Sequence, residues 1–334
     1  MRSYLYVPGD SPAKLAKALT VGADALIVDL EDAVPPSGKD AARAAVATFL
    51  AAAASAPAAA SATADDAAPA PGAAGAGAGK IAVSGQNLGS NHTSGPDTAI
   101  FTATPIAAGG VPRIWVRINP GELGHVDAAA VVGPGLAGLY FAKTESVEQL
   151  TALDTLLARL EQRAGLPPGA VRVVPLLESA AAVLAAPVIA RGPRVARLQL
   201  GEADLAADLG VVLGPDEREL WWARSHAVLA CAAAGIAPPV APVSVNFRDL
   251  DALRESTLAL KRLGFRGRAC IHPAQLAVVH EVFTPAESEL AAARDLVRRH
   301  EQAVRDGSGV CLDERGRLVD EAVVRSARRL LSGE

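Results

Sequence analysis

The sequence is poor in cysteine and lacks the cysteine spacings that build zinc ribbons or disulfide frameworks. Its 334 residues include three cysteines, Cys231, Cys270 and Cys311, which lie far apart in the chain. No Cys-x-x-Cys pair occurs, so neither a zinc ribbon nor a disulfide-stapled fold is indicated. We expect the thiols to be reduced, as is usual for a cytoplasmic protein.

Long apolar runs and an excess of basic residues are also missing. No stretch approaches the roughly 18 apolar residues of a membrane span, and the first residues lack the apolar core of a signal peptide. The formal net charge of −4 argues against nucleic acid or an anionic membrane as the main partner. The first apolar run is not followed by Gly-x-Gly-x-x-Gly, so a dinucleotide-binding fold is not favoured.

One long segment lacks the large apolar residues that a core needs. From about Ala51 to Gly110 the chain consists mostly of Ala, Gly, Ser and Pro, with few charges. Such a segment does not bury enough apolar surface to offset the entropy lost on ordering. We expect a disordered Ala/Gly-rich insertion in a surface loop, with a helical start and with His92 facing solvent. A lid or a partner-binding arm is the alternative.

Outside this insertion, short apolar runs alternate with helical segments. The eight expected strands are Ser3–Pro8, Ala25–Leu30, Ile114–Asn119, Gly138–Lys143, Arg172–Glu178, Val195–Leu200, Val240–Phe247 and Arg268–Pro273. Strict alternation implies parallel strands with right-handed crossovers, and eight repeats favour a closed (β/α)8 TIM barrel of the α/β class. We expect the barrel over residues 1–285, interrupted at about 51–110, and a C-terminal helical extension or lid over residues 286–334.

Charged and polar residues recur where the expected strands end. In chain order they are Asp29, Glu31, Asp32, Arg117, Asn119, Lys143, Glu145, Glu178, Glu202, Asp204 and His272. In a TIM barrel these ends share one rim, and the rim carries the chemistry. A charged group at the end of an apolar strand must be solvated, paired or bound to a metal. The rim is therefore the expected active site.

Two of these acids suit a hard divalent cation. Glu178 and Asp204 follow neighbouring strands, so they can bring two carboxylate oxygens to one point. Mg²⁺ binds through one or two carboxylates and keeps positions for water and substrate, and no histidine pair or cysteine cluster favours zinc. The pattern predicts a Mg²⁺ that chelates a 2-oxo acid and acts as a Lewis acid. Arg117 is then placed to stabilise the oxygen that gains negative charge.

The strand-end motifs resemble those of the citrate lyase β-subunit-like group of the HpcH/HpaI aldolase superfamily, which includes malyl-CoA and citramalyl-CoA lyases. The matching segments are Arg2–Gly9, Gly22–Pro35, Val116–Asn119, Lys143–Ser146, Pro175–Ser179, Leu200–Gly210, Gly264–Arg268 and Ile271–Gln275. Each motif is short, but together they span nearly the whole chain outside the insertion in the same order.

The resemblance implies roles for four residues around the substrate. Glu178 and Asp204 match the two Mg²⁺ ligands, and Glu178 also faces the substrate. Arg117 matches an arginine that contacts a substrate oxygen during catalysis. Lys143 resembles a pocket residue that supports the acids and helps to bind the substrate.

Three aspartates match catalytic positions of the family. Asp29 and Asp32 match acidic strand-end residues near the metal-bound water. The segment Leu318–Glu321 resembles a tail whose aspartate reaches the active site of a neighbouring subunit. Asp320 is therefore a catalytic candidate, and the resemblance implies a homo-oligomer, either a trimer or a hexamer. Asp320 also suits the N-cap of a helix that begins after it.

The activity implied by the resemblance is a Mg²⁺-dependent carbon–carbon lyase that cleaves or forms a 3-hydroxyacyl-CoA thioester. A base removes the hydroxyl proton, the carbon–carbon bond breaks to give a 2-oxo acid and a thioester enolate, and Asp320 protonates the enolate. Three alternatives stay open. They are an aldolase acting on a free 4-hydroxy-2-oxo acid, an acyl-carrier-protein-dependent citrate lyase β subunit, and a non-enzymatic binding module on the same fold.

The sequence departs from the family pattern at three places. They are the long insertion, Asn246 where an acid is common, and Arg268 in place of a frequent lysine, which changes the geometry of the charge. These departures affect the identity of the substrate rather than the metal site. Coenzyme A needs cations for its phosphates. The candidates are Lys14, Lys17, Lys39 and Arg43, although each also suits a solvated helix face.

Overall fold

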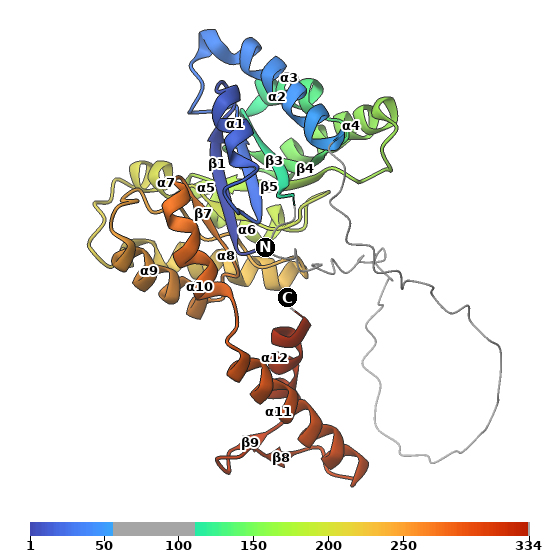
Figure 1. Cartoon of the computed structure of the whole chain (residues 1–334), viewed down its shortest axis with the longest axis vertical. Coiled ribbons are helices and arrows are strands. Elements are labelled where there is room, and N and C mark those ends of the chain that lie inside the picture. The colour runs from blue at the N-terminus through green and yellow to red at the C-terminus, as the bar shows by residue number, and fades with distance from the viewer. Residues whose placement is uncertain (56–110, 333–334) are drawn as a thin grey trace, which may run out of the picture. The chain divides into compact units, whose positions relative to one another are not determined.

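The computed structural model describes residues 1–55 and 111–332, and the structural statements below concern these residues. A parallel sheet runs in the order β6-β5-β4-β3-β2-β1-β7 (Figure 1). Its strands are Ser3–Pro8 (β1), Ala25–Asp29 (β2), Arg113–Ile118 (β3), Leu136–Phe141 (β4), Arg172–Leu177 (β5), Gln199–Leu200 (β6) and Arg268–Cys270 (β7). β1 pairs with both β2 and β7, so the first and the last strand of the sheet along the chain are neighbours.

A short bridged segment replaces the full strand expected over Val240–Phe247. Val240 bridges to Gln199 of β6, and Ala241 bridges to Arg268 of β7, both in parallel. Prolines on both sides of this pair supply no N–H to a sheet ladder, so the strand does not extend. The expected length of this strand is therefore wrong, but the two bridges join β6 to β7 and complete the circuit of the (β/α)8 barrel.

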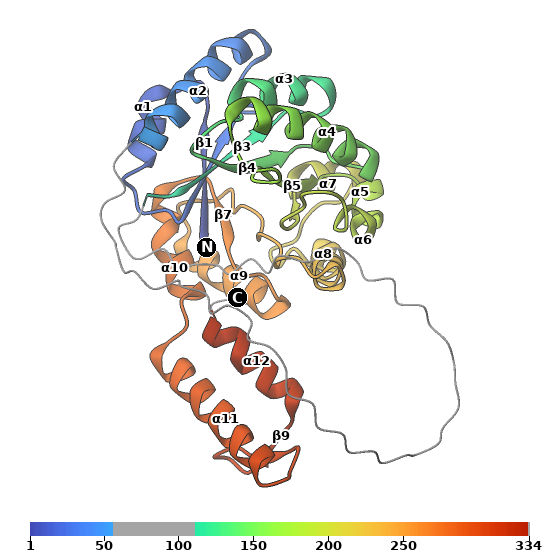
Figure 2. The ribbon, with the colours of Figure 1, turned by 90° about the vertical axis from the view of Figure 1, so that its right-hand side faces the viewer.

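Helices follow the strands and surround the sheet (Figure 2). They are α1 (Pro12–Ala18), α2 (Lys39–Ser55), α3 (Gly121–Val131), α4 (Val147–Ala164), α5 (Ala180–Leu184), α6 (Ala186–Ile189), α7 (Glu202–Leu209), α8 (Trp221–Ala234), α9 (Leu250–Leu263) and α10 (Leu276–Phe283). Short 3₁₀ turns lie at Pro36–Gly38 (η1), Arg218–Leu220 (η2) and Pro273–Gln275 (η3). The predicted insertion and His92 lie outside the described residues, except that its first residues continue α2 to Ser55.

The helix α4 shows how the sequence sets an element's ends and its buried face. Ser146 accepts a hydrogen bond from the backbone N–H of Gln149, whose side chain accepts one in return, which forms a capping box. Gly165 ends the helix in the left-handed region at φ 66°. Its buried leucines recur at helical spacing and are Leu150, Leu153, Leu157 and Leu160. Ser11 occupies the N-cap position of α1, but its side chain makes no capping hydrogen bond.

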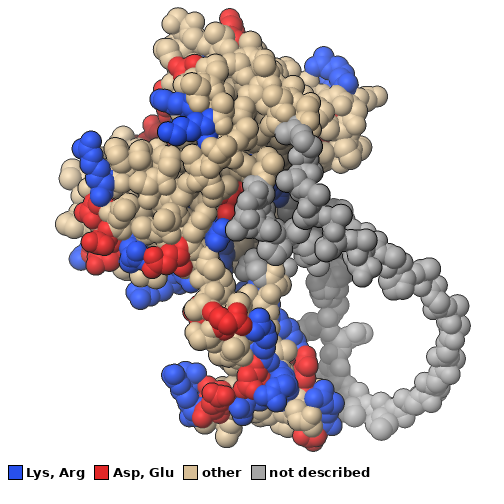
Figure 3. All heavy atoms as spheres, in the orientation of Figure 1, with Lys and Arg blue, Asp and Glu red and all other residues tan. Residues whose placement is uncertain are grey.

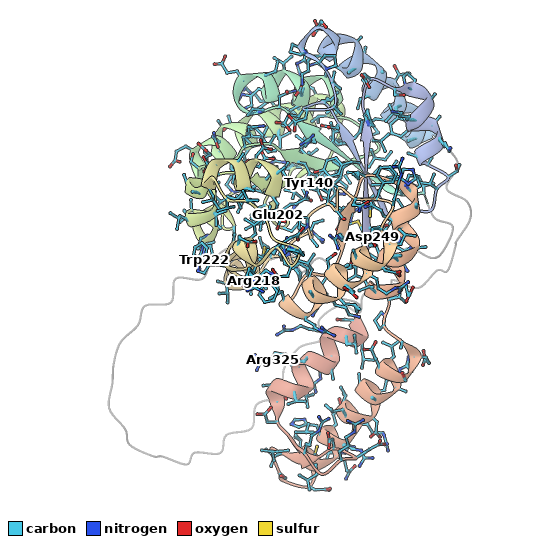
Figure 4. All side chains as sticks on the ribbon, turned by 90° about the vertical axis from the view of Figure 1, so that its left-hand side faces the viewer. Tyr140, Glu202, Arg218, Trp222, Asp249 and Arg325 are labelled. Carbon is cyan, nitrogen blue, oxygen red and sulfur yellow. The ribbon has the colours of Figure 1, made fainter. Side chains whose placement is uncertain are left out.

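Alternating strand residues build two apolar clusters on the two sides of the sheet. The outer cluster fills the space between strands and helices and includes Leu5, Leu26 and Leu139. The inner cluster fills the barrel, where Trp115 meets Tyr140 (labelled in Figure 4) edge to face, with ring centroids 5.7 Å apart. Because the interior is filled with side chains, substrate binding is confined to a rim of the barrel.

The chain continues beyond the barrel as two helices joined by a short hairpin. The elements are α11 (Glu287–Arg305), β8 (Cys311–Leu312), β9 (Leu318–Val319) and α12 (Glu321–Ser332). The two helices lie side by side and bury Ala293, His300, Val324 and Ala327. Acidic and basic side chains alternate over their surface (Figure 3). Within the described ranges, no helix combines the length and apolarity required to cross a bilayer.

Candidate active site

Arg117, the penultimate residue of β3, is the centre of a charged cluster at the rim. The cluster consists of Arg117 with Asp29, Glu31, Asp32 and Lys143. Its Nε donates to Asp29 Oδ1 at 2.7 Å and its Nη2 donates to Asp29 Oδ2 at 2.6 Å. Its Nη1 lies 2.8 Å from Glu31 Oε2 and donates to Asp32 Oδ2 at 3.2 Å. A guanidinium has five N–H groups, and three of them make these hydrogen bonds. Among the described residues, one N–H of Nη1, beside Glu31, and one N–H of Nη2 make no hydrogen bond. Arg117 is thus fixed in place, and the second N–H of Nη2 is left for a ligand oxygen.

Asp29, at the end of β2, serves mainly to hold Arg117. Its carboxylate also accepts hydrogen bonds from the backbone N–H groups of Glu31 and Ala33, at 2.8 and 3.2 Å. With the two bonds from Arg117, it accepts four hydrogen bonds and is buried. Burial would lower the pKa of Arg117, but the hydrogen bonds from Arg117 to Asp29 outweigh it and raise that pKa. No lone pair of Asp29 remains to orient a water molecule.

Glu31 is the residue of this cluster that the sequence analysis named only as a rim acid and gave no role. It is buried, its Oε1 accepts from Lys143 Nζ at 2.6 Å, and its Oε2 faces Arg117 without an aligned donor. Burial raises the pKa of Glu31, and the nearby Arg117 and Lys143 oppose that rise. Glu31 lies in the chain between Asp29 and Asp32, which the family resemblance identifies. The backbone turn after β2 decides that Asp29 and Glu31 are buried and that Asp32 is exposed.

Glu178 lies against the backbone of Gly201, three residues before Asp204 in the chain. Register pairs Leu177 of β5 with Leu200 of β6, so Glu178 and Gly201 follow as neighbours on the rim. A Cβ on Gly201 would lie only 2.5 Å from Glu178 Oε1, so that oxygen lies against the backbone that leads into Asp204. Asp204 stands exposed in the first turn of α7, and among the described residues no hydrogen bond or ion pair engages it.

The carboxylates of Glu178 and Asp204 suit a divalent metal ion. Burial, and next the charge of Glu31, raise the pKa of Glu178 to about 7, and Asp204 adds to the rise. A cation held by Glu178 and Asp204 would remove this repulsion between carboxylates. Among the described residues, no set of three or more His, Cys, Asp or Glu side chains forms a metal cage. Two carboxylates with open positions are the donor set that suits Mg²⁺.

Lys143 connects the two halves of the cluster. Its backbone N–H donates to Glu178 Oε2 at 2.8 Å, while its Nζ reaches Glu31. Its φ of 49° lies in the left-handed region, which is uncommon for a residue with a side chain. This turn lets one residue bind one acid through its backbone and the other through its side chain.

A buried network behind the rim fixes the loop after β2. Asp127 of α3 accepts from both the backbone N–H and Nδ2 of Asn119, at 2.8 and 2.6 Å, and from Arg43 Nε at 2.7 Å. Lys39 Nζ donates to the carbonyls of Leu30 and Glu31 and to Asn119 Oδ1. Lys39 and Arg43 are therefore committed to this network, and the expectation that they bind coenzyme A phosphates is wrong. Sequence reasoning missed Asp127 entirely.

Ion pairs of Arg224 hold the first turn of α7 in place. Buried Arg224 of α8 donates to Glu202 (labelled in Figure 4) through Nε at 2.7 Å and Nη2 at 2.6 Å. Arg224 also donates to Glu217, in the loop before η2, at 2.6 Å. Because Glu202 lies two residues before Asp204, this clamp restricts the backbone that carries Asp204.

Asp320 lies on the C-terminal hairpin rather than on the rim. Its Oδ1 accepts from the backbone N–H groups of Ala322 and Val323, at 3.0 and 3.1 Å, so it caps α12 as the sequence predicts. Within the described ranges, these are its hydrogen bonds, and none reaches the charged cluster. The second carboxylate oxygen of Asp320 stays exposed.

We predict that Gly201→Ala weakens Mg²⁺ binding without unfolding the barrel. The added Cβ would overlap the carboxylate of Glu178, so that side chain must leave its position against residue 201. The expected result is at least a tenfold loss of Mg²⁺ affinity, roughly the free energy of one strained rotamer. Calorimetric titration measures it, and Gly133→Ala, with no atom within 4 Å of its added Cβ and no positive φ, controls for a glycine replaced away from the site. Unchanged affinity in Gly201→Ala would mean that Glu178 is not a ligand.

Comparison with known proteins agrees with this geometry. The profile of the family described as HpcH/HpaI aldolase/citrate lyase matches residues 2–64 and 98–273. A citrate lyase subunit beta-like protein of Deinococcus radiodurans is 30% identical over the whole chain and 97% of that protein. An L-malyl-CoA/beta-methylmalyl-CoA lyase of Cereibacter sphaeroides is 27% identical over 98% of this chain and 92% of its own length.

A solved structure similar to the chain contains ligands. It is the CitE protein of Mycobacterium tuberculosis in complex with magnesium, acetoacetate and coenzyme A. The similarity covers 100% of this chain and 98% of that one, with a TM-score of 0.64 and 25% sequence identity. Fold, metal chemistry and relatives therefore lead to the same family.

Proposed function

Because the chain belongs to the HpcH/HpaI aldolase/citrate lyase family, a family of lyases, we propose that it cleaves or forms a carbon–carbon bond in a 3-hydroxyacyl-CoA thioester. Malyl-CoA and citramalyl-CoA are the substrates we favour. The observation that carries the proposal is the position of Glu178 against Gly201, near enough to the unengaged Asp204 for the two carboxylates to repel each other. The lyase activity on malyl-CoA named for the Cereibacter relative and the ligands of the Mycobacterium structure support the choice.

The metal would be held by Glu178 and Asp204. Bound there, Mg²⁺ supplies the Lewis acid that holds the carboxylate and the adjacent oxygen of the acid portion of the substrate. The remaining N–H of Arg117 Nη2 donates to the substrate oxygen that loses its proton and becomes the keto oxygen of the product. Lys143 binds Glu178 through its backbone N–H and Glu31 through Nζ, which holds both carboxylates in position.

Asp32 and Asp29 have different tasks in this proposal. Asp32 is 62% exposed and its carboxylate makes one contact, to Arg117, so it retains an oxygen that can orient the water that takes the hydroxyl proton. Asp29 is occupied by four donors and acts on the reaction by holding Arg117. As the hydroxyl proton leaves, the carbon–carbon bond breaks and its electron pair moves onto the thioester as an enolate.

A proton must then reach the thioester α-carbon, and we assign that step to Asp320 of a neighbouring copy. The exposed second oxygen of Asp320 is available for it, while the first caps α12. This assignment makes the working enzyme a homo-oligomer, a trimer or hexamer by the family resemblance. Release of a 2-oxo acid and an acyl thioester completes the reaction with no change of oxidation state overall.

The assay that tests the function offers purified protein with Mg²⁺ a panel of substrates. We expect glyoxylate or pyruvate to be released from malyl-CoA or citramalyl-CoA. A free 4-hydroxy-2-oxo acid and a citryl thioester on acyl carrier protein complete the panel. Cleavage of either of these, with no cleavage of a coenzyme A thioester, would replace the proposal with an aldolase or a citrate lyase subunit.

Complementation between two inactive variants tests the role of Asp320. Glu178→Gln chains lack a metal ligand but keep Asp320, and Asp320→Asn chains have the opposite defect. We expect each variant alone to lose activity and their co-expressed mixture to regain a measurable fraction, because mixed oligomers contain some complete sites. No recovery in mixtures shown by mass to contain both chains would place Asp320 outside a shared site.

A further inference from the structure

The layer of side chains just below the charged rim contains a polar pair that has no task in the proposed reaction. It consists of Tyr6 of β1 and Gln199 of β6. Tyr6 lies beside Ile27, two residues before Asp29, and Gln199 lies two residues before Gly201. Tyr6 packs against the inner cluster, so its ring points into the barrel. Because the barrel below is filled, this layer forms the floor beneath a substrate that binds at the rim.

The hydroxyl of Tyr6 has a hydrogen-bonding capacity that the chain leaves unused. It accepts a hydrogen bond from Gln199 Nε2 at 3.2 Å. A phenol can donate as well as accept, and among the described residues the O–H of Tyr6 donates to no acceptor. Tyr6 is partly exposed, whereas Tyr4, the next inward-facing residue of β1, is fully buried. Tyr6 is therefore accessible from the rim.

The charged groups around this phenol belong to the proposed active site. The guanidinium carbon of Arg117 lies 5.3 Å from the centre of the Tyr6 ring, which makes a cation–π contact. Burial raises the pKa of Tyr6, Arg117 opposes that rise, and the charges of Asp29 and Glu178 add to it. The phenol thus lies within electrostatic range of both Arg117 and Glu178, and it keeps the proton that it needs as a donor.

Gln199 carries an unpaired polar atom in the same layer. The residue is 3% exposed, its Nε2 is engaged with Tyr6, and among the described residues its Oε1 has no hydrogen-bond partner. A buried polar atom is rarely left unpaired, and in a site it is commonly satisfied by a ligand or by ordered water. The floor therefore offers one donor, from Tyr6, and one acceptor, from Gln199, beneath the charged rim.

We propose that Tyr6 is a substrate-binding residue whose hydroxyl donates to the carboxylate of the 2-oxo acid portion, while Gln199 holds the phenol in position. An acid that chelates a metal ion at Glu178 and Asp204 uses one carboxylate oxygen, so its second oxygen needs a donor. This inference rests on the proposed lyase function and adds a residue that recognises the acid portion of the substrate. The role belongs to the hydroxyl, because the ring already packs against Arg117.

Two phenylalanine variants on one strand test the proposal. Tyr6→Phe removes the hydroxyl and keeps the ring beside Arg117. Tyr4→Phe is the matched control, since it makes the same change on the same face of β1, one layer deeper, where the hydroxyl accepts from Arg197 Nη1 at 2.5 Å. Oxalate, a planar dicarboxylate that stands in for the bound 2-oxo acid, is titrated by calorimetry into each protein saturated with Mg²⁺.

The expected result is a roughly tenfold or greater loss of oxalate affinity in Tyr6→Phe, as for a lost hydrogen bond to a charged group. Tyr4→Phe should bind oxalate as wild type does. Mg²⁺ affinity without oxalate should be equal in all three proteins, because no metal ligand is changed. In thioester cleavage, KM should rise in Tyr6→Phe while kcat stays unchanged, since the carboxylate is held in both the ground state and the transition state.

Two results would overturn the proposal. One is an oxalate affinity of Tyr6→Phe equal to that of wild type. The other is an equal loss of Mg²⁺ affinity and oxalate affinity in Tyr6→Phe, which would indicate a general disturbance of the site.

The same titration separates this inference from the proposed function. If wild type binds oxalate and Tyr6→Phe binds it tenfold more weakly, but wild type cleaves no thioester, the role of Tyr6 stands and the proposed function fails. If wild type cleaves the thioester and both proteins bind oxalate equally, the role of Tyr6 fails and the proposed function stands.

Discussion

Glu178→Gln is expected to abolish lyase activity while leaving the protein at least as stable as wild type. Glutamine fills the same volume but offers a weak, neutral ligand to Mg²⁺, so we expect kcat/KM to fall by ~10³ or more. The fold itself gains from the change. Burial and the charge of Glu31 raise the pKa of Glu178 from 4.5 to about 7, so the ionised carboxylate destabilises the metal-free protein.

The sign of the stability effect follows from linkage. A carboxylate whose folded-state pKa is raised costs stability only where it ionises, so the penalty is absent below pH 4.5 and complete above about pH 7. Thermal unfolding of the metal-free proteins should therefore show a higher Tm for Glu178→Gln at pH 8 and equal values at pH 4. Glu255→Gln, at an exposed acid of α9, is the matched control and should alter neither property. A Glu178→Gln protein that unfolds more easily at pH 8 would mean that Glu178 is a structural acid.

Replacing Arg117 with methionine is expected to reduce both activity and stability. The change leaves Asp29 and Glu31 buried without their main counter-charge, and removing one partner of a buried ion pair typically costs about 3–5 kcal/mol. It also removes the donor to the substrate oxygen, and loss of one such donor costs ~10²–10³ in kcat. The measurements are kcat/KM on the active thioester and denaturant unfolding at neutral pH.

Arg117→Lys separates the two effects. Lysine keeps a positive charge near the acids, so we expect it to recover part of the stability that methionine loses. A single ammonium does not reproduce the paired hydrogen bonds to Asp29, so activity should stay low. Arg159→Met, at an exposed arginine of α4, controls for the loss of a surface charge. Full activity in Arg117→Lys would show that charge alone matters, contrary to the geometry of the Asp29 pair.

The sequence predicts the barrel and the chemical groups on its rim because both follow from periodic patterns. Apolar runs alternate with helical segments throughout, and acids follow strand ends at positions such as Glu178 and Asp204. The sequence also contains a feature that predicts the short seventh strand and that the sequence analysis did not use. Prolines flank Val240 and Ala241 and remove the donors that a longer strand needs, so only isolated bridges form there.

The division of labour among the rim acids was not predictable from spacing. Asp29, Glu31 and Asp32 are adjacent in the chain, and a single turn buries the first two and leaves the third 62% exposed. Asp127 gave no motif at all, since one aspartate in a helix usually faces solvent. Its burial depends on Asn119 and Arg43, which approach it from β3 and α2. Such partners are known only once the elements are placed in space.

The rings of Phe247 and His272, which stack with their centroids 4.6 Å apart, illustrate the same limit. They lie about 25 positions apart in the chain, a separation that carries no periodic signal. Gln275 brings their loops together through three hydrogen bonds to backbone groups. The Ile271–Gln275 motif indicated the family, but it did not predict that Gln275 joins these two loops.

Titration of Mg²⁺ into the metal-free protein by calorimetry tests the central claim most directly. Wild type at pH 8 should bind one Mg²⁺ per chain, and Glu178→Gln and Asp204→Asn should each lose that binding. At pH 6 the wild-type affinity should drop by roughly tenfold, since a proton then competes for Glu178, whose pKa is about 7. Equal Mg²⁺ affinity in wild type and both variants would contradict a metal site built from these two carboxylates.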